Sequence, residues 1–293
     1  MRKVVNYLSC ILAVGILWTG CYAIGAYVAD QYVTRVEVVI DNLDHRIDTL
    51  NDSFDGLRVH TGYQSVPYCD LMRISVKIEA KTASGSGVVM SRIIDGKVIN
   101  FVWTAGHVVE HVKTEAGFDK VQVIREIRVN GLLKREEKAN ARVIAYSDKY
   151  DEDLALLEIE EAGFFPKYFG FTFNVEPQYP GTPVVHVGAT YGLYGSVTLG
   201  IVAQTDRELK GQRFDQTTCL CYPGSSGGGI FTYEGECIGL ITRGVGPGLN
   251  FIVPARRIKA WAEREGIAWA FDRTIPVPLT RASTELERYG VTQ

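Results

Sequence analysis

The stretch YPGSSGGGIF, residues 222–231, combines four glycines and two serines with an aromatic residue near each end. An apolar run follows directly, and another begins at Cys237, so the glycines lie between two expected strands. A flexible glycine–serine linker would be repetitive and solvated, and this stretch is neither. We therefore expect a rigid turn that presents one serine hydroxyl.

The glycines on both sides of Ser226 allow the backbone to bend so that the N–H groups of Gly224 and Ser226 point the same way. Two convergent N–H donors beside a hydroxyl form an oxyanion hole, and one such donor lowers a barrier by about 3 kcal/mol. Ser225 would point away from them. The turn thus predicts Ser226 as a nucleophile and Gly224 and Ser226 as oxyanion donors.

A candidate catalytic histidine lies earlier in the chain, after an expected strand and a turn of small residues. In FVWTAGHVV an expected strand ends at Thr104, and the small residues Ala105 and Gly106 then lead to His107. A neutral imidazole near pH 7 is well matched to general-base catalysis. His111 is a weaker candidate because no such turn precedes it.

An acidic partner is expected at Asp153, in YDEDLALLEIE. Asp148, Asp151 and Glu152 are typical turn residues. Asp153 instead adjoins an apolar run, which places its carboxylate at the edge of a core, where a charge needs a partner. The N–H of the catalytic imidazole would supply that partner.

TAGH, DLALL and GSSGG, in this order, resemble the His, Asp and Ser motifs of the chymotrypsin-fold serine proteases. The resemblance covers roughly residues 68–265, and VTLGIVA and NFIVPARRI are similar to its HtrA/Deg-type branch. It implies an acyl-transfer endopeptidase whose catalytic triad is His107, Asp153 and Ser226. We expect protein or peptide substrates and a role in protein quality control or processing.

The same resemblance suggests where substrate binds. SGSGVVM is similar to the family's strand before the histidine, and CIGLITRG to the strand that pairs with a substrate backbone. Thr242, Arg243 and Gly244 would then edge the cleft, and Leu220 would form the floor of the primary specificity pocket. Because no Asp occupies that floor, we expect a small or medium apolar residue before the scissile bond.

The chain also departs from its relatives. Val108 replaces the cysteine that follows the histidine in secreted digestive enzymes, and no zymogen-type activation terminus is found. Only a short tail, 271–293, follows the expected protease domain, so we expect no PDZ domain. Two alternatives stay open: a protease-fold binding or chaperone module, and a self-processing protease of viral type.

From about residue 65 the chain consists of short β-branched runs separated by turn residues, which indicates an all-β domain. A break rich in aromatic residues and proline, 164–183, divides twelve runs into two groups. We predict two six-stranded antiparallel β-barrels, at about 68–162 and 180–253, in a protease domain of 65–270. A C-terminal helix is expected at 254–265. The runs are 71–80, 84–90, 97–105, 121–129, 141–147, 154–160, 183–190, 196–204, 213–221, 227–233, 237–244 and 249–255.

The N-terminal segment differs from the rest in composition. No residue from Val4 to Ala29 is charged, and about 20 apolar residues suffice to cross a bilayer. Arg2 and Lys3 precede it and acidic residues follow, so we expect a transmembrane helix, residues 1–30, with a cytoplasmic N-terminus and an extracytoplasmic protease domain. A cleaved signal peptide, or lipidation at Cys21, is the alternative.

Residues 31–60 show the alternating spacing of three and four that makes helices supercoil. This pattern predicts a short coiled-coil stalk and a homo-oligomer. A single amphipathic helix packed on the globular domain or lying on the membrane is the alternative. The apolar positions are Val33, Val36, Ile40, Leu43, Ile47, Leu50, Phe54 and Leu57.

The overall composition and charge bear on the expected partners and cofactors. The chain of 293 residues is 46% hydrophobic and 22% charged, with a net charge of −3, so nucleic acid is not an expected partner. No Cys/His spacing of the zinc type is present, and we expect neither metal nor cofactor. Four cysteines lie outside the membrane segment: Cys69, Cys219, Cys221 and Cys237. The alternatives for the last three are free thiols, or a disulfide from Cys219 or Cys221 to Cys237.

Overall fold

The computed structural model describes residues 68–94, 96–129, 132–165 and 170–278, all within one unit that spans residues 66–293. The predicted membrane anchor and stalk lie outside the described residues, as does the end of the predicted tail. No helix among the described residues is both long enough and apolar enough to span a bilayer.

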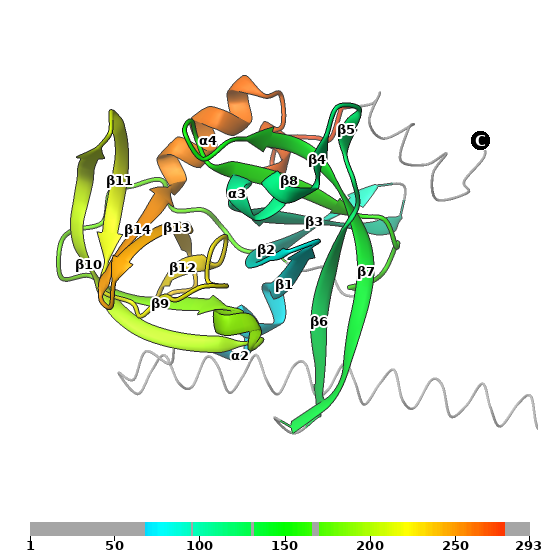
Figure 1. Cartoon of the computed structure of the whole chain (residues 1–293), viewed down its shortest axis with the longest axis horizontal. Helices are drawn as coiled ribbons and strands as arrows, with labels where there is room; N and C mark the ends of the chain where they lie inside the picture. The colour runs from blue at the N-terminus through cyan, green and yellow to red at the C-terminus, as the bar shows by residue number, and fades with distance from the viewer. Residues whose placement is uncertain (1–67, 95, 130–131, 166–169, 279–293) are drawn as a thin grey trace, which may run out of the picture. The chain divides into compact units, whose positions relative to one another are not determined.

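Two closed antiparallel barrels form the molecule (Figure 1), and they confirm the predicted all-β architecture. Barrel one has the strand order β1-β2-β3-β8-β7-β6, and barrel two has the order β10-β11-β14-β13-β12-β9. Barrel one consists of β1 (Ser75–Ala80), β2 (Ala83–Ile94), β3 (Lys97–Thr104), β6 (Val121–Val129), β7 (Leu132–Ser147) and β8 (Leu154–Ile159). Barrel two consists of β9 (Pro183–Gly188), β10 (Ser196–Leu209), β11 (Gln212–Thr217), β12 (Gly229–Thr232), β13 (Cys237–Gly246) and β14 (Leu249–Pro254).

The remaining elements are short and lie between or after the barrel strands. They are the helices α2 (Tyr68–Ile74), α3 (Gly106–Val109) and α4 (Ala255–Arg264), the 3₁₀ turns η1 (Glu110–Val112), η2 (Thr190–Gly192) and η3 (Ala268–Ala270), and the paired strands β4 (Lys113–Thr114) and β5 (Gly117–Phe118). Helix α4 confirms the predicted C-terminal helix.

One expected strand was partly wrong. The run 71–80 was predicted as strand throughout, with a helix expected only at 254–265, but its first part belongs to α2 and β1 begins at Ser75. Leu71 and Ile74, three residues apart, are both buried, which is the spacing of a helix face. The Ser75 hydroxyl donates a hydrogen bond to the Leu71 carbonyl (2.9 Å) and so satisfies one group at the helix end.

Strand β8 is buried along its whole length because each of its faces meets a different core. Ala155, Leu157 and Ile159 point into the interior of barrel one. Leu154 and Leu156 point the other way, into a core shared by both barrels. Since side chains alternate along a strand, a run that is apolar at all positions but one fits this place. The exception is Glu158, whose buried carboxylate pairs with Arg142.

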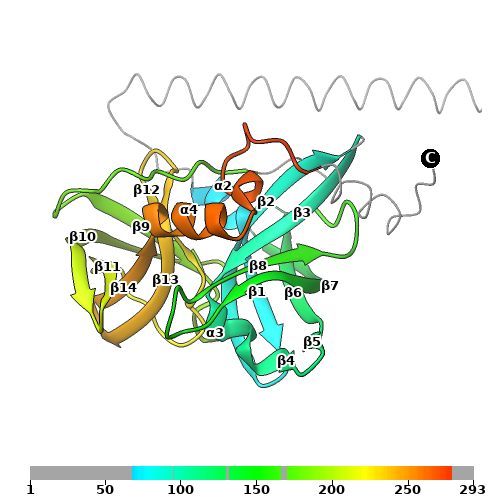
Figure 2. The same cartoon turned by 90° about the horizontal axis from the view of Figure 1, so that it is seen from above.

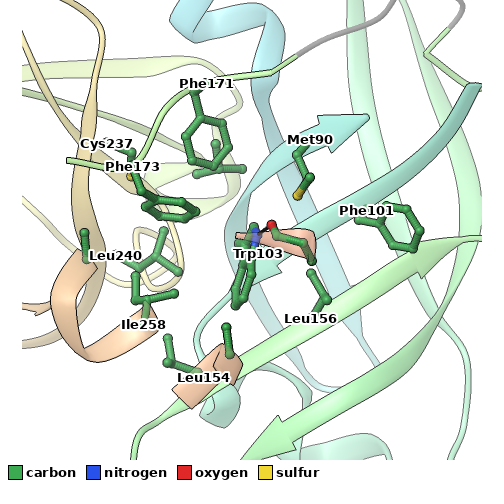
Figure 3. Close-up of a cluster of buried hydrophobic side chains, with 14 of the residues drawn as sticks. Met90, Phe101, Trp103, Leu154, Leu156, Phe171, Phe173, Cys237, Leu240 and Ile258 are labelled. Atoms are coloured by element: carbon green, nitrogen blue, oxygen red, sulfur yellow. Dashed lines mark hydrogen bonds between the residues drawn. The ribbon is translucent and has the colours of Figure 1, made fainter. Parts of the chain in front are cut away.

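The shared core fills the space where the barrels meet (Figure 3). It is rich in aromatic residues, and edge-on ring contacts join Trp103 of β3 to Phe173 (5.9 Å between ring centroids) and to Trp261 of α4 (6.0 Å). Helix α4 lies along the junction of the two barrels (Figure 2). The residues labelled in Figure 3 are Met90, Phe101, Trp103, Leu154, Leu156, Phe171, Phe173, Cys237, Leu240 and Ile258. This packing fixes the two barrels against each other.

Candidate active site

His107 follows the end of β3, as the sequence suggests. Strand β3 ends at Thr104, and α3 begins at Gly106, where a Cβ atom would collide with the carbonyl oxygen of Ser147. Only glycine fits this close approach. The His107 side chain is 29% exposed and lies at the rim of barrel one.

Asp153 lies immediately before β8 and has a left-handed backbone, with φ of 56°. It is almost fully buried, and both of its carboxylate oxygens lie 3.0 Å from His107 Nδ1. The carboxylate also accepts hydrogen bonds from the His107 backbone N–H (2.9 Å) and from the Thr242 hydroxyl. These contacts place the imidazole proton on Nδ1 and leave Nε2 as an acceptor.

The environment of Asp153 keeps it ionised. Burial alone would raise the pKa of this carboxyl. The hydrogen bond and charge of His107, together with the Thr242 hydroxyl, outweigh burial and hold the pKa of Asp153 below its ordinary value. An ionised carboxylate at this position can stabilise an imidazolium during proton transfer.

The loop before Asp153 is held by its own hydrogen bonds. Asp148 accepts from the backbone N–H of Tyr150 at its side chain (2.8 Å) and from that of Asp153 at its carbonyl (2.9 Å). The Ser147 hydroxyl accepts from the N–H of Glu152 (2.9 Å) and donates to Asp151 (2.8 Å). Asp148 and Asp151 thus have the turn-forming role expected from the sequence.

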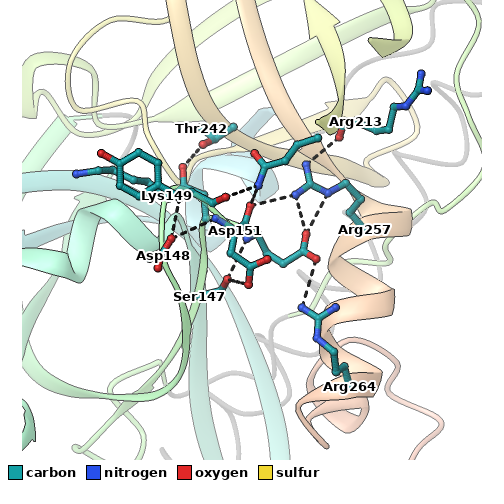
Figure 4. A network of polar contacts seen from close by, with 12 residues as sticks. Ser147, Asp148, Lys149, Asp151, Arg213, Thr242, Arg257 and Arg264 are labelled. Carbon is teal, nitrogen blue, oxygen red and sulfur yellow. Dashed lines mark hydrogen bonds and ion pairs between the residues drawn. The ribbon is translucent and has the colours of Figure 1, made fainter. Parts of the chain in front are cut away.

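The same loop is also fastened to α4, as Figure 4 shows. Arg257 forms an ion pair with Glu152 (2.7 Å), and Arg264 reaches the other oxygen of that carboxylate (3.3 Å). Sequence analysis missed this contact, because nothing in the local pattern connects an acidic turn residue with arginines about a hundred positions later. It ties the residue before Asp153 to the helix that follows barrel two.

Ser226 lies in a turn whose shape depends on glycine. Gly224 and Gly227 have φ of 94° and 82°, and a Cβ atom at Gly224 would strike the carbonyl of Ala189. The turn is closed by hydrogen bonds from Gly227 N–H to the Ile241 carbonyl (2.7 Å) and from Gly228 N–H to the Ser225 carbonyl (2.9 Å). It is a fixed turn, as the sequence predicts.

Barrel one holds this turn through Ser86 of β2, a residue that sequence analysis did not single out. The Ser86 hydroxyl donates to the Gly224 carbonyl (2.6 Å) and accepts from the Ala189 N–H (2.7 Å). Its backbone N–H donates to the Ser226 carbonyl (2.7 Å). A serine within the glycine-rich SGSG run was the only sequence signal for this role.

The two N–H groups expected to form the oxyanion hole have no hydrogen-bond acceptor among the described residues. Within the described residues, neither Gly224 nor Ser226 donates a backbone hydrogen bond. The Pro223 carbonyl accepts from Tyr191 N–H (2.6 Å), and in a trans peptide the following N–H points the opposite way. The N–H of Gly224 is thereby aimed away from Tyr191 and is available for an anionic oxygen.

Ser226 and His107 line neighbouring cavities. One, of about 450 Å³, includes His107 and Asp153, and the other, of about 350 Å³, includes Ser226. Thr242 and Arg243 line both. No hydrogen bond joins the Ser226 hydroxyl to His107 among the described residues, and such contacts often tighten only when substrate binds.

The residues predicted to bind substrate fall into two groups. Thr242, Arg243 and Gly244 line the cavity of Ser226, together with Cys221 and Tyr222. Leu220, the predicted floor of the specificity pocket, does not line this cavity and is 43% exposed. The next residue, Cys221, lines the cavity instead. The lining contains no carboxylate.

The cysteines near this turn are free thiols. Cys219 and Cys237 are buried, and Cys221 is partly buried. Burial raises the pKa of all three, that of Cys237 to about 12, so they are protonated at neutral pH. In the described part of the chain, no group of His, Cys, Asp and Glu side chains could hold a metal ion.

Comparison with known proteins agrees with this geometry. The family model described as a trypsin-like peptidase domain matches residues 85–240, more than half of the chain. The chain belongs to the trypsin-like peptidase family. The matched region of this trypsin-like peptidase contains His107, Asp153 and Ser226, and the family membership confirms the resemblance on which the sequence analysis rests.

The relatives that this trypsin-like peptidase resembles in sequence include serine proteases of the HtrA type. The chain is 29% identical to serine protease HTRA1B of Danio rerio over 75% of this chain and 42% of that protein. Serine protease HTRA1A of the same fish is 30% identical over 71% of this chain and 40% of that protein. The chain therefore spans less than half the length of the curated relatives it matches.

A solved structure shares the fold. The serine endoprotease from Yersinia pestis superimposes with a TM-score of 0.52 at 22% identity, over 68% of this chain and 66% of that one.

Proposed function

We propose that this chain hydrolyses peptide bonds in protein substrates through an acyl-enzyme formed on Ser226. The observation that carries the proposal is the arrangement around Asp153, whose buried carboxylate holds His107 by two hydrogen bonds and is itself held by Thr242. Such a carboxylate fixes the imidazole tautomer that can accept a proton at Nε2.

In the proposed reaction, substrate binding brings Ser226 Oγ to His107 Nε2. His107 removes the hydroxyl proton as the oxygen attacks the peptide carbonyl, and Asp153 stabilises the imidazolium. The N–H groups of Gly224 and Ser226 then bind the oxyanion. His107 returns its proton to the leaving amine, and water subsequently releases the acyl group.

The location of the enzyme is also part of the proposal. The uncharged segment from Val4 to Ala29 and the basic residues before it support a single-pass anchor with the protease domain on the extracytoplasmic side. The heptad pattern of residues 31–60 supports a homo-oligomer formed through a stalk. Protein quality control or processing outside the cytoplasm is the role that fits these features.

A fluorophosphonate probe tests the proposal directly, because it labels only a serine activated by its neighbours. The full chain in detergent micelles is incubated with the probe beside Ser226→Ala and His107→Ala, and covalent labelling is measured by intact mass. We expect labelling of the wild type alone. Absence of labelling in the wild type would overturn the enzyme hypothesis and favour the binding or chaperone module.

The self-processing alternative needs a separate measurement. Wild type and Ser226→Ala are compared on a denaturing gel after expression. One common size for both would exclude self-processing, whereas a larger Ser226→Ala product would support it.

A further inference from the structure

The cavity beside His107 has an unusual set of cations. Barrel one contributes Lys149, from the loop before Asp153, and barrel two contributes Lys210 and Arg243. The only carboxylate in the lining is Asp153, which is buried and already binds His107 and Thr242. The mouth of the cavity is therefore positively charged.

Arg243 carries a charge that no carboxylate of the described residues neutralises. Its guanidinium donates to the Lys149 carbonyl (2.6 Å) and to the Gln212 side-chain oxygen (3.1 Å), and it lies 4.9 Å from the centre of the Phe214 ring. These neutral partners fix the side chain in place and leave its positive charge available.

The lysines differ in how far they are neutralised. Lys210 lies at the tip between β10 and β11, with φ of 53°, and forms no ion pair among the described residues. Lys149 pairs with Glu110 at 3.1 Å, and both side chains are substantially exposed. Three further acids lie in the same loop but do not line the cavity: Asp148 binds backbone N–H groups, Asp151 binds the Ser147 hydroxyl and Glu152 is bound by Arg257. The lining itself thus has three cationic side chains and one carboxylate.

A substrate chain has a defined path past this cavity. Strand β13 pairs with β12 only as far as Leu240, while on its other side it pairs with β14 as far as Gly246. From Thr242 to Gly246 the β12-side edge carries no strand in the described part of the chain. An extended peptide can add to such an edge, and its side chains then alternate between two faces.

We infer that this cavity is a specificity site for an acidic side chain of the substrate, at the second or fourth residue before the scissile bond. The inference rests on the proposed function. The first residue before that bond enters the cavity of Ser226, where Arg243 is the only charged side chain, and alternation turns the second and fourth toward His107, Lys149 and Lys210. Glutamate or aspartate at one of these positions gains a favourable interaction that a neutral residue lacks.

The test compares matched peptides that differ only in Glu or Gln at each of the four positions before the scissile bond. With the full chain in detergent, we expect kcat/KM to be about 2- to 5-fold higher for Glu at the second or fourth position, as for partly exposed ion pairs. Replacing both lysines, Lys149→Gln with Lys210→Gln, should bring this ratio close to 1. Lys259→Gln removes one positive charge from the exposed face of α4, far from the cavity lining, and should leave the ratio unchanged.

A second measurement does not depend on catalysis. Binding of the same Glu and Gln peptides to Ser226→Ala is followed by fluorescence anisotropy, and the preference for Glu should decline in 1 M salt, where the Debye length is about 3 Å. Equal binding of the two peptides at low salt, or a ratio unaffected by the double lysine variant, would overturn the inference. Lack of turnover with a retained binding preference would instead count against the proposed function alone.

Discussion

At the scale of single residues, the site depends on one carboxylate and the groups that hold it. Asp153 accepts three kinds of hydrogen bond, from an imidazole, a backbone N–H and a hydroxyl, although it lies at the edge of a core. Its left-handed backbone is uncommon for a residue other than glycine, and such strain is typical of functional sites.

Removing the hydroxyl that binds Asp153 should impair catalysis without unfolding the protein. In Thr242→Val the shape is kept but one donor to a charged acceptor is lost, which is worth about 1.5 to 3 kcal/mol. We expect kcat/KM to fall roughly 10- to 100-fold. Thr242→Ser keeps the donor and should retain most of the activity, so equal losses in both variants would contradict this role.

His186 gives the protein a pH-dependent stability. It is fully buried behind the nucleophile turn, its Nδ1 lies 3.2 Å from the Gly229 carbonyl, and its Nε2 has no partner among the described residues. Burial lowers the pKa of His186 from 6.5 to about 4. The unfolded chain therefore binds a proton more readily, and stability is lost as the pH falls from about 6.5 towards 4.

The expected loss from His186 is about 2 kcal/mol between pH 7 and pH 5. His186→Gln can still donate to Gly229 but cannot be protonated, so its unfolding free energy, measured by urea titration, should change less over that interval. Other titrating groups contribute equally to both proteins and cancel in the comparison. Identical pH dependence would show that His186 does not titrate in this way.

At the scale of elements, helix α4 serves the active site from a distance. Its buried face joins the shared core, and Arg257 and Arg264 hold the loop that contains Asp153 (Figure 4). Arg257 also stacks on Phe214, 4.8 Å from the ring centre, and so connects that loop to β11. Helix α4 thus connects the shared core to the loop that orients the Asp153 carboxylate.

A double-mutant cycle tests this link. Both side chains of the Arg257–Glu152 pair are 16% exposed, and we expect Glu152→Gln and Arg257→Met to be coupled by about 1 kcal/mol in unfolding free energy. Each single variant should also lower kcat more than KM, because Glu152 and Arg257 position Asp153 and line neither cavity of the site. Additive effects, or unchanged kcat, would show that the pair is a surface contact without consequence.

The elements themselves were largely predictable from local pattern. Turn residues and β-branched runs suffice to locate all twelve barrel strands, and the helix at 254–265 follows from its spacing. The misplaced start of β1 shows the limit, since LMRI has helix spacing within a run rich in strand formers. The roles of Ser86, Glu152 and Arg257 could not be predicted, because they depend on contacts between segments far apart in the chain.

At the scale of the whole molecule, the two barrels share one hydrophobic core. After α4, Trp269 packs edge-on against Phe101 of barrel one (4.9 Å), and Phe271 stacks on Phe173 of the segment between the barrels (4.4 Å). Arg92 of β2 donates to the carbonyls of Trp269 (2.9 Å) and Ile275 (2.7 Å). The segment after α4 thus packs against barrel one and the shared core.

Removing one of these rings should weaken the whole protein. Trp269 is almost fully buried, and Trp269→Ala should lower the unfolding free energy by about 3 to 5 kcal/mol. Because the core is shared, we expect one unfolding transition that moves to lower temperature in calorimetry. A split into two transitions would show that the barrels unfold independently.

Ser86 has one further consequence for the molecule. The hydroxyl that positions the nucleophile turn of barrel two belongs to barrel one, and the histidine and the serine are likewise supplied by different barrels. Neither half of the gene therefore encodes a working enzyme. An exchange of one barrel between two related proteases would have to preserve the fit of a single hydroxyl against a distant carbonyl, so the halves are bound to evolve together.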